Sequence, residues 1–400
     1  MNIPFSPPDV TENEIEAVAE VLRSGWITTG PKTKELEKLI ADYVGADRCV
    51  CLNSQTACAE LALRLLGIGE GDEVVTSAYT YTATAAVIDH VGAKIVLVDT
   101  QKGSLEMDYE ALECAITERT KAIIPVDIAG IPCDYDRIFE IVERKKCLFK
   151  PVGTLQSALG RIVVLADAAH ALGASYKGRA VGSVADFSAF SFHAVKNLTT
   201  AEGGALTWRA ISGVSSEDMY DKLRIMSLHG QTADALTKSE MDAWEYDVLG
   251  TYYKCNMTDV AAAMGISQLE RYPAMLERRK RIVEKYDAAL KPLGIQTLDH
   301  YADTHLSSGH LYLTRVPDIT AKERNAIITK MAECGIACNV HYKPLPMLTA
   351  YKKLGFAIGD FPNSYAAYVG EITLPLHTLL TDEQVDYVIK NYTRILKEYL

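Results

Sequence analysis

The sequence predicts an α/β fold, with a large domain built on a mostly parallel β-sheet and a smaller carboxy-terminal domain. From about residue 11 to residue 336, helix-like segments alternate with short, strand-like apolar runs, as in parallel sheets covered by helices. A long helical pattern, rich in Arg and Glu in its second half, extends from Thr258 to about Leu293. We expect this helix to connect a large domain at 1–270, which includes an amino-terminal arm, to a small domain at 271–400.

Two helices are predicted in the first 70 residues. The first should begin after Thr11, because Thr11 and Glu14 have the spacing of a capping box. Its apolar residues recur at helical spacing on one face and are Ile15, Val18, Ala19 and Leu22. The second helix should begin after Ser54 and end at Gly67 and Gly69.

The strands of the predicted sheet are short apolar runs bounded by turn residues. They lie at 73–76, 95–99, 122–126, 162–166, 187–192 and 205–208. The stretch 145–160 shows no clear periodicity, so we expect an excursion on the surface.

The composition excludes several classes of protein. A chain of 400 residues with 48% hydrophobic and 23% charged residues is ordinary for a globular enzyme. No apolar run reaches membrane-spanning length and the amino terminus lacks a signal-peptide pattern, so we expect a cytoplasmic protein without a membrane partner. The net charge of −11 argues against nucleic acid as a partner. Nine cysteines without CxxC spacing indicate reduced thiols, and no metal site is expected.

The most informative segment surrounds Lys196, which follows the apolar run ending at Phe192 and precedes Gly203 and Gly204. A lysine held near the core loses its proton easily and can attack a carbonyl carbon to form a Schiff base. The aldehyde of pyridoxal 5'-phosphate (PLP) is the usual partner in such sites. The alternative is a lysine whose amine extends from the strand end into solvent.

Asp167 directly follows the apolar run at 162–166, and His170 lies three residues later. Ligands of parallel sheets collect at the carboxyl ends of strands, where a carboxylate could pair with the PLP pyridine nitrogen. His170 could contact the cofactor ring. The alternatives are that Asp167 caps a following helix and that His170 is a buried structural residue.

Polar residues at the predicted helix start after Ser54 could hold a phosphate, since helix amino termini bind anions. Thr56 offers a hydroxyl there, and Ser191 offers another five residues before Lys196; a plain Ser/Thr helix cap is the alternative. Tyr81 follows the strand at 73–76 and could cover one face of a flat ring, although it could also be a core tyrosine.

These segments resemble the DegT-type family of PLP-dependent sugar aminotransferases, which have fold-type I. The similarity extends over nearly the whole chain, and its most specific part is the Ser-Phe-His-x-x-Lys-x-Leu-Thr-Thr-x-Glu-Gly-Gly block at 191–204. Supporting matches lie at 25–31, 54–57, 167–170, 253–257, 340–342 and 374–376. The resemblance implies a seven-stranded, mostly parallel sheet and a small α+β domain.

The resemblance also implies roles for individual residues. Lys196, Asp167 and His170 would be catalytic, with Lys196 bound to PLP and moving a proton, and Asp167 paired with the pyridinium. The residues implied to hold the cofactor with them are Gln55, Thr56, Ala57, Tyr81, Ser191 and Asn256. Members are homodimers with shared sites, in which Asn256 would reach the neighbouring subunit's phosphate. The residues implied to contact the nucleotide sugar are Trp26, Ile27, Thr28, Thr29 and His341.

The reaction implied by the resemblance is transfer of an amino group from L-glutamate to a keto carbon of a UDP- or dTDP-activated deoxysugar, in amino-sugar and polysaccharide biosynthesis. Related dehydratases carry histidine in place of this lysine, so Lys196 favours transamination. Two alternatives are a cyclic polyol ketone as acceptor and a non-catalytic, PLP-binding regulatory protein. Departures from the family pattern occur at Gln55, at Asp127, where histidine is frequent, and in the long stretch 145–160.

Overall fold

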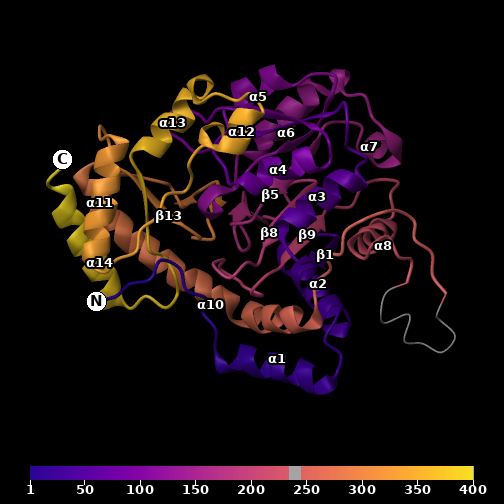
Figure 1. Cartoon of the computed structure of the whole chain (residues 1–400), viewed down its shortest axis with the longest axis horizontal. Coiled ribbons are helices and arrows are strands. Elements are labelled where there is room, and N and C mark those ends of the chain that lie inside the picture. Colours follow the sequence, from indigo (N-terminus) through magenta and orange to yellow (C-terminus); the bar gives the residue numbers. More distant parts are fainter. Residues whose placement is uncertain (234–244, 400) are drawn as a thin grey trace.

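A computed structural model describes residues 1–233 and 245–399. Within these residues, a seven-stranded sheet forms the centre of the larger part of the molecule (Figure 1). The order of its strands is β1 (Arg48–Leu52), β9 (Gly204–Trp208), β8 (Phe187–Ser191), β5 (Val163–Asp167), β4 (Thr120–Ile124), β2 (Glu73–Ser77) and β3 (Lys94–Val98). In this sheet β9 runs antiparallel to both neighbours and the other strands are parallel. The predicted α/β fold with a mostly parallel sheet is confirmed.

Helices cover both faces of this sheet, and the alternation of side chains explains why its strands are apolar throughout. In β5, Val164 and Ala166 belong to the core on one face, whereas Val163 and Leu165 belong to the core on the other. The first core is covered by α2 (Pro31–Val44), α5 (Tyr109–Ala115) and α6 (Tyr135–Arg144). The second is covered by α3 (Gln55–Leu65), α4 (Thr82–His90) and α8 (Ser216–Ser227).

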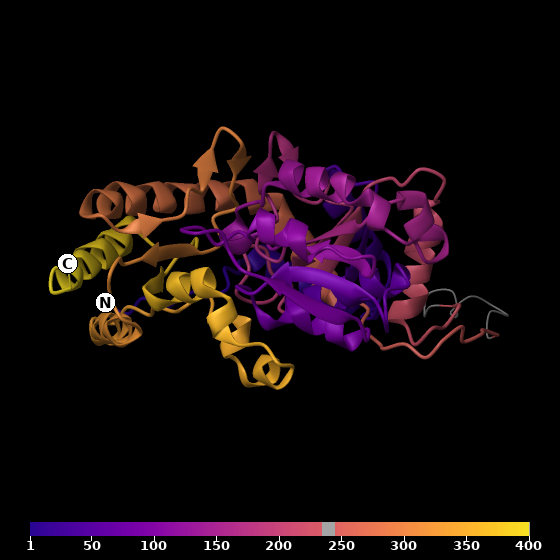
Figure 2. The same ribbon diagram turned by 90° about the horizontal axis from the view of Figure 1, so that it is seen from above.

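The long helix α10 (Asp259–Leu290) runs along one side of the molecule, beside α1 (Glu12–Ser24) at one end and α14 (Asp382–Leu396) at the other (Figure 1). The carboxyl part contains a three-stranded sheet in the order β10 (Gln296–Thr297), β13 (Tyr312–Arg315) and β14 (Glu371–Leu374). With α10, α11 (Ala321–Glu333) and α14, this sheet forms the smaller part of the molecule (Figure 2). These elements enclose a separate apolar core that also contains Ile3. The predicted division into domains at 1–270 and 271–400 stays a proposal. Ile3, from the amino-terminal arm assigned to the first domain, packs in the core of the second.

Short elements complete the described chain. A small sheet has the order β11 (Tyr301–Ala302), β12 (His305–Leu306), β6 (Ser175–Tyr176) and β7 (Arg179–Ala180). The remaining α-helices of the described residues are α7 (Gly153–Leu159), α12 (Thr349–Lys353) and α13 (Pro362–Val369). Among the residues described, no helix is both long and apolar enough to cross a lipid bilayer.

The stretch 145–160 lies largely at the surface, as expected, but it contains helices that the sequence did not reveal. A 3-10 helix at Lys146–Leu148 and α7 occupy this stretch. The side-chain amide of the buried Gln156 donates to the carbonyl oxygen of Leu66 (2.8 Å). Leu155 and Leu159 of α7 also pack against the second core, but two apolar residues in a helix of seven residues are too short a pattern for periodicity to reveal.

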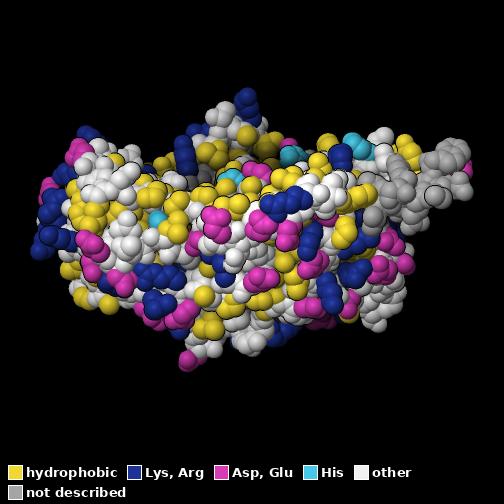
Figure 3. Space-filling view, turned by 90° about the horizontal axis from the view of Figure 1, so that it is seen from below, with side chains coloured by type: hydrophobic (Ala, Val, Ile, Leu, Met, Phe, Trp, Pro, Cys, Tyr) yellow, Lys and Arg dark blue, Asp and Glu magenta, His cyan; other side chains and the backbone are white. Residues whose placement is uncertain are grey.

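The predicted capping contact of α1 forms, but its apolar face does not lie in the core. The Glu14 carboxylate accepts hydrogen bonds from the backbone N–H and the hydroxyl of Thr11 (both 2.6 Å). Ile15 and Leu22 are 53% and 57% exposed, whereas Glu14 is fully buried. Figure 3 shows a band of hydrophobic side chains across the face of the molecule on which α1 lies.

Candidate active site

A cavity of about 450 Å³ opens at the carboxyl ends of β5 and β8, beside the start of α3. The sequence-predicted site residues that line it are Gln55, Thr56, Tyr81, Asp167, His170, Ser191, Lys196 and His341. Parallel strands end at one edge of a sheet, so residues far apart in the sequence meet there.

Lys196 is half-buried and lines this cavity, so its side chain does not extend freely into solvent. Enclosure by protein opposes its charged form and lowers the Lys196 pKa to about 8, although the carboxylate of Asp167 acts in the opposite direction. This shift raises the neutral fraction at pH 7 from about 0.03% to about 10%. No described residue forms a salt bridge or hydrogen bond with this amine, so it is free to react.

Asp167 is the last residue of β5 and is buried. Its carboxylate accepts hydrogen bonds from the Thr84 hydroxyl (2.6 Å) and the Ala169 N–H (3.2 Å). Residues 168–174 form turns, so the alternative in which Asp167 caps a helix is wrong. Burial raises the pKa of Asp167, while Thr84, Ala169 and Lys196 oppose that shift. A cationic N–H placed beside Asp167 would keep its carboxylate ionised.

His170 is held as a neutral ring in one tautomer. The Ala129 N–H donates to its Nδ1 (3.2 Å), so the ring proton resides on Nε2, 3.1 Å from the Tyr342 hydroxyl oxygen. Burial, with Lys196 and His341 adding to it, lowers the pKa of His170 well below its usual value. The His310 ring centroid lies 4.3 Å away. His170 is therefore both buried and part of the cavity wall.

The start of α3 forms the next part of the wall. The Ser54 hydroxyl accepts the Ala57 N–H (3.1 Å), so Ser54 is the helix cap that the alternative interpretation described. Gln55 and Thr56 nevertheless line the cavity, whereas Ala57 does not. Gly204 permits this arrangement, since a Cβ at that position would lie 2.5 Å from the Gln55 nitrogen.

Tyr81 is 59% exposed and precedes α4 at the mouth of the cavity, so it is not a core tyrosine. Its ring centroid lies 5.9 Å from that of Tyr342. The neighbouring Tyr79 is the fully buried one. Tyr81 is thus accessible to a flat ligand in the cavity.

Six predicted site residues do not line the cavity within one chain: Trp26, Ile27, Thr28, Thr29, Ala57 and Asn256. Several of them contact one another next to the start of α10. The Asn256 amide donates to the Thr29 hydroxyl (2.6 Å), and the Trp26 indole donates to the Thr29 carbonyl (3.2 Å). Their roles remain predictions.

Sequence reasoning missed several cavity residues. Phe5 stacks on His341 with ring centroids 5.5 Å apart, and the Ser6 hydroxyl donates to the Val195 carbonyl (3.2 Å). His310 and Tyr342 come from the carboxyl half of the chain. These contacts join segments separated by more than a hundred residues, so local patterns did not predict them; Tyr342 alone lies in a segment, 340–342, that resembles the family.

Asp127 also lines the cavity, and the strand-end rule that found Asp167 could have found it. It follows β4 and is fully buried, with both carboxylate oxygens accepting from the Tyr135 hydroxyl (3.0 and 2.8 Å) and one from the Cys133 N–H (2.9 Å). Burial raises the pKa of Asp127 to about 7.

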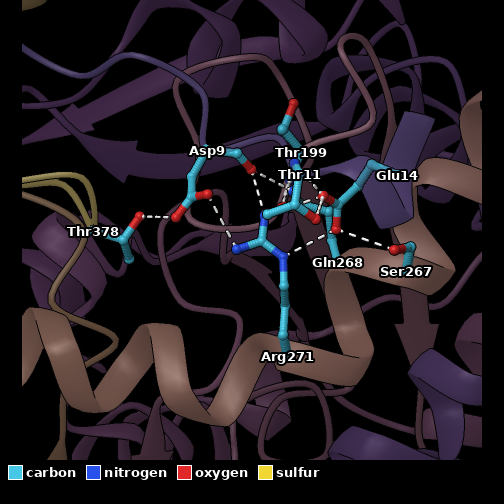
Figure 4. Close-up of polar contacts among 8 residues, drawn as sticks. All are labelled: Asp9, Thr11, Glu14, Thr199, Ser267, Gln268, Arg271 and Thr378. Carbon is cyan, nitrogen blue, oxygen red and sulfur yellow. Dashed lines mark hydrogen bonds and ion pairs between the residues drawn. The ribbon is translucent and has the colours of Figure 1, made fainter. Parts of the chain in front are cut away.

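A polar network fastens the Lys196 loop to the amino-terminal arm (Figure 4). The Gln268 amide accepts the Thr199 N–H (3.4 Å) and donates to the Asp9 carbonyl (2.7 Å). The Arg271 guanidinium binds the carboxylates of Asp9 (3.1 Å) and Glu14 (2.9 Å). The loop that carries Lys196 is thereby attached to α10 and to α1.

Comparisons with known proteins agree with this arrangement. The sequence matches the family described as DegT/DnrJ/EryC1/StrS aminotransferase over residues 8–393. It is 38% identical over 399 residues to the spore coat polysaccharide biosynthesis protein SpsC of Bacillus subtilis (strain 168), covering 99% of this chain and 97% of that protein.

The chain is also similar to solved structures of aminotransferases. Spr1654 of Streptococcus pneumoniae, described as a candidate sugar aminotransferase, is 56% identical in its PMP form, with a TM-score of 0.97 and full coverage of both chains. Its PLP form is 55% identical, with a TM-score of 0.96 and the same coverage. PseC of Helicobacter pylori, an aminotransferase involved in the biosynthesis of pseudoaminic acid, is 27% identical with a TM-score of 0.84 and full coverage of both chains.

Proposed function

The chain belongs to the DegT/DnrJ/EryC1/StrS aminotransferase family, and from this premise we propose that it moves an amino group from L-glutamate to a keto carbon of a UDP- or dTDP-activated deoxysugar. Its cofactor is PLP. The observation that carries the proposal is the amine of Lys196, which lies in the same cavity as Asp167 with its pKa lowered to about 8.

The residues of the cavity fit PLP. Lys196 would hold the aldehyde carbon covalently, Asp167 would pair with the ring nitrogen, and Tyr81 would cover one face of the ring. Thr56 and Ser191, at the start of α3 and the end of β8, would hold the phosphate. When bound, PLP withdraws electrons from the substrate carbon that loses its proton.

Lys196 would then move that proton, since an amine with a pKa near neutrality both accepts and returns protons. Asp167 would keep the ring nitrogen protonated. Burial disfavours an unpaired Asp167 carboxylate, so a cation beside it is stabilising. His170 and the residues behind it would orient the ring without changing charge.

The names of the relatives support a sugar as amino acceptor and a role in polysaccharide biosynthesis. A nucleotide on that sugar, L-glutamate as donor and a cytoplasmic location are our proposals. In the homodimer that we propose, Trp26–Thr29 would contact the sugar and Asn256 would reach the neighbour's cofactor phosphate. The exposed apolar face of α1, with Ile15 and Leu22, supports self-association.

The test is a pair of half-reactions followed by absorbance. L-Glutamate should convert the PLP form to the pyridoxamine form, and a keto-deoxysugar linked to UDP or dTDP should then restore the PLP spectrum. An unchanged spectrum with L-glutamate would contradict the donor and would favour a non-catalytic, PLP-binding regulatory protein. Restoration by a cyclic polyol ketone, but by no sugar nucleotide in the panel, would contradict the acceptor.

A further inference from the structure

A buried hydrogen-bonded chain lies behind His341 and leads away from the cavity. Glu371 and Thr373 are two residues apart on β14, so their side chains share one face of the strand. Both are buried, with exposures of 2% and 0%. The Thr373 hydroxyl oxygen lies 2.5 Å from Glu371 Oε1 and 2.9 Å from His341 Nδ1. Glu371 Oε2 accepts the backbone N–H of His341 (2.8 Å).

The His341 ring carries this chain to the cavity. It lines the cavity and stacks on Phe5. Burial, with Lys196 adding to it, lowers the pKa of His341 to about 4, so the ring is neutral at physiological pH and carries a single proton. Nε2, the ring nitrogen that does not face Thr373, forms no hydrogen bond with the described residues and is available to a ligand.

The single hydrogen of the Thr373 hydroxyl links the two ends of the chain. An ionised Glu371 can only accept, so the hydroxyl donates to it and must accept from His341 Nδ1–H. His341 then presents a bare Nε2 to the cavity. A protonated Glu371 donates to the hydroxyl, which donates in turn to Nδ1, and His341 presents Nε2–H. Each state of the carboxyl group thus selects one tautomer of the ring.

We propose that Glu371 determines, through Thr373, which nitrogen of His341 carries the ring proton, and therefore whether His341 offers the substrate a hydrogen-bond donor or an acceptor. In the donor state Nε2–H suits a carbonyl or phosphate oxygen; in the acceptor state Nε2 suits a sugar hydroxyl. Glu371 and Thr373 are positioning residues in this account. The inference rests on the proposed function, in which His341 contacts the sugar substrate.

The surroundings of Glu371 place its titration in an accessible range. Burial raises its pKa to about 8, while Thr373, the His341 N–H and the Arg324 guanidinium oppose that shift. The other titratable groups that interact with it electrostatically are Tyr79, Tyr342, Cys338 and Tyr392. Burial raises the pKa of each of these, so all stay neutral across the range in which Glu371 changes charge.

Glu371→Gln provides the decisive variant, because it has nearly the same shape and cannot ionise. The amide oxygen would accept the His341 N–H, which leaves the amide NH₂ to donate to Thr373. The Thr373 hydroxyl would donate to Nδ1, so the ring should stay in the Nε2–H tautomer at every pH. Thr373→Val removes the relay, and Thr373→Ser preserves its hydroxyl.

The tautomer of His341 is read by ¹⁵N NMR of the PLP-bound protein labelled at histidine, without substrate, and His341→Asn identifies the resonance. We expect the wild type to change from Nε2–H to Nδ1–H between pH 6 and pH 10, with a midpoint near 8. Thr373→Ser should change likewise, Glu371→Gln should stay Nε2–H throughout, and Thr373→Val should show no change of tautomer with pH. A single tautomer in the wild type over this range, or the same change in Glu371→Gln, would overturn the proposal.

This measurement needs no turnover, so its outcome is independent of the half-reaction assays. A tautomer change in a protein that does not react with L-glutamate would support the relay and contradict the proposed function. An enzyme that is active but keeps one His341 tautomer at every pH would support the proposed function and contradict the relay.

Discussion

At the scale of single residues, the cavity keeps an amine and a carboxyl group close together while burial opposes the charged form of each. It lowers the pKa of Lys196 to about 8 and raises that of Asp167. The two groups form no salt bridge, so the attraction between them offsets burial only in part. A lysine in this state is a better nucleophile at neutral pH than one at the surface.

The lowered pKa of Lys196 predicts how cofactor capture depends on pH. Only the neutral amine attacks the PLP aldehyde, so the capture rate of the cofactor-free protein should rise with pH and level off above about 8. Asp167→Asn removes the carboxylate that raises the Lys196 pKa, and its midpoint should lie lower. Stopped-flow absorbance between pH 6 and pH 10 measures both. A wild-type midpoint near that of free lysine would contradict the account.

At the scale of elements, the sequence revealed those parts of the fold whose side chains follow a regular period. The runs at 73–76, 95–99, 122–126, 162–166, 187–192 and 205–208 all correspond to strands. Strand β1 was missed. It pairs with β9, a contact between residues more than 150 positions apart. Periodicity identified the apolar face of α1, but it could not tell whether that face, with Ile15 and Leu22, is buried or exposed in the single chain.

The residues of the candidate site also divide into those that local sequence patterns predicted and those that they did not. Lys196, Asp167 and Ser191 were found because each lies at or just after the end of an apolar run that predicts a buried strand. Phe5, His310 and Tyr342 were missed, since their place in the cavity depends on how the two ends of the chain pack. Ser54 caps α3 while Thr56 lines the cavity, and phosphate binding by Thr56 stays a prediction.

Arg271 should contribute strongly to stability because its partner Glu14 is fully buried. Arg271→Met leaves that carboxylate without its cation, and we expect a loss of about 3 kcal/mol in the free energy of unfolding. Urea denaturation measures it. Arg23→Met is the control. It removes an exposed ion pair with Glu16 on α1, the helix that carries Glu14, and should leave stability nearly unchanged. Equal effects of the two substitutions would contradict the role of the network.

Gly204 should be required for the start of α3 to approach β9. Gly204→Ala places a Cβ 2.5 Å from the Gln55 nitrogen, so we expect a loss of about 1–3 kcal/mol in stability and weaker PLP binding. Gly359→Ala adds a methyl group where no atom lies within 4 Å and serves as control. Thermal unfolding and PLP titration measure the two effects; normal PLP affinity in Gly204→Ala would show that this approach does not shape the cofactor site.

At the scale of the whole molecule, several predicted site residues lie outside the cavity of their own chain, and α1 exposes apolar side chains. Trp26, Thr29 and Asn256 contact one another beside α10 rather than the cavity. A second copy of the chain would bring such residues to a neighbouring site and would cover apolar surface. Both observations support the proposed homodimer.

The self-association is tested by changing the exposed face of α1. Ile15→Lys with Leu22→Lys should weaken or abolish the dimer, because two charges would have to be desolvated at the interface. Leu354→Lys is the control, since Leu354 is similarly exposed (52%) in a different part of the chain. Sedimentation velocity measures the oligomeric state. A dimer of unchanged affinity in the double variant would exclude this face from the interface.

The account depends most directly on the covalent bond between the Lys196 amine and PLP. Borohydride reduction of the PLP-bound protein, followed by proteolysis and mass spectrometry, locates that bond. The account predicts one pyridoxyl-modified peptide, carrying the label on Lys196, and none in Lys196→Ala. A label on another lysine, or no label in freshly reconstituted protein, would contradict it.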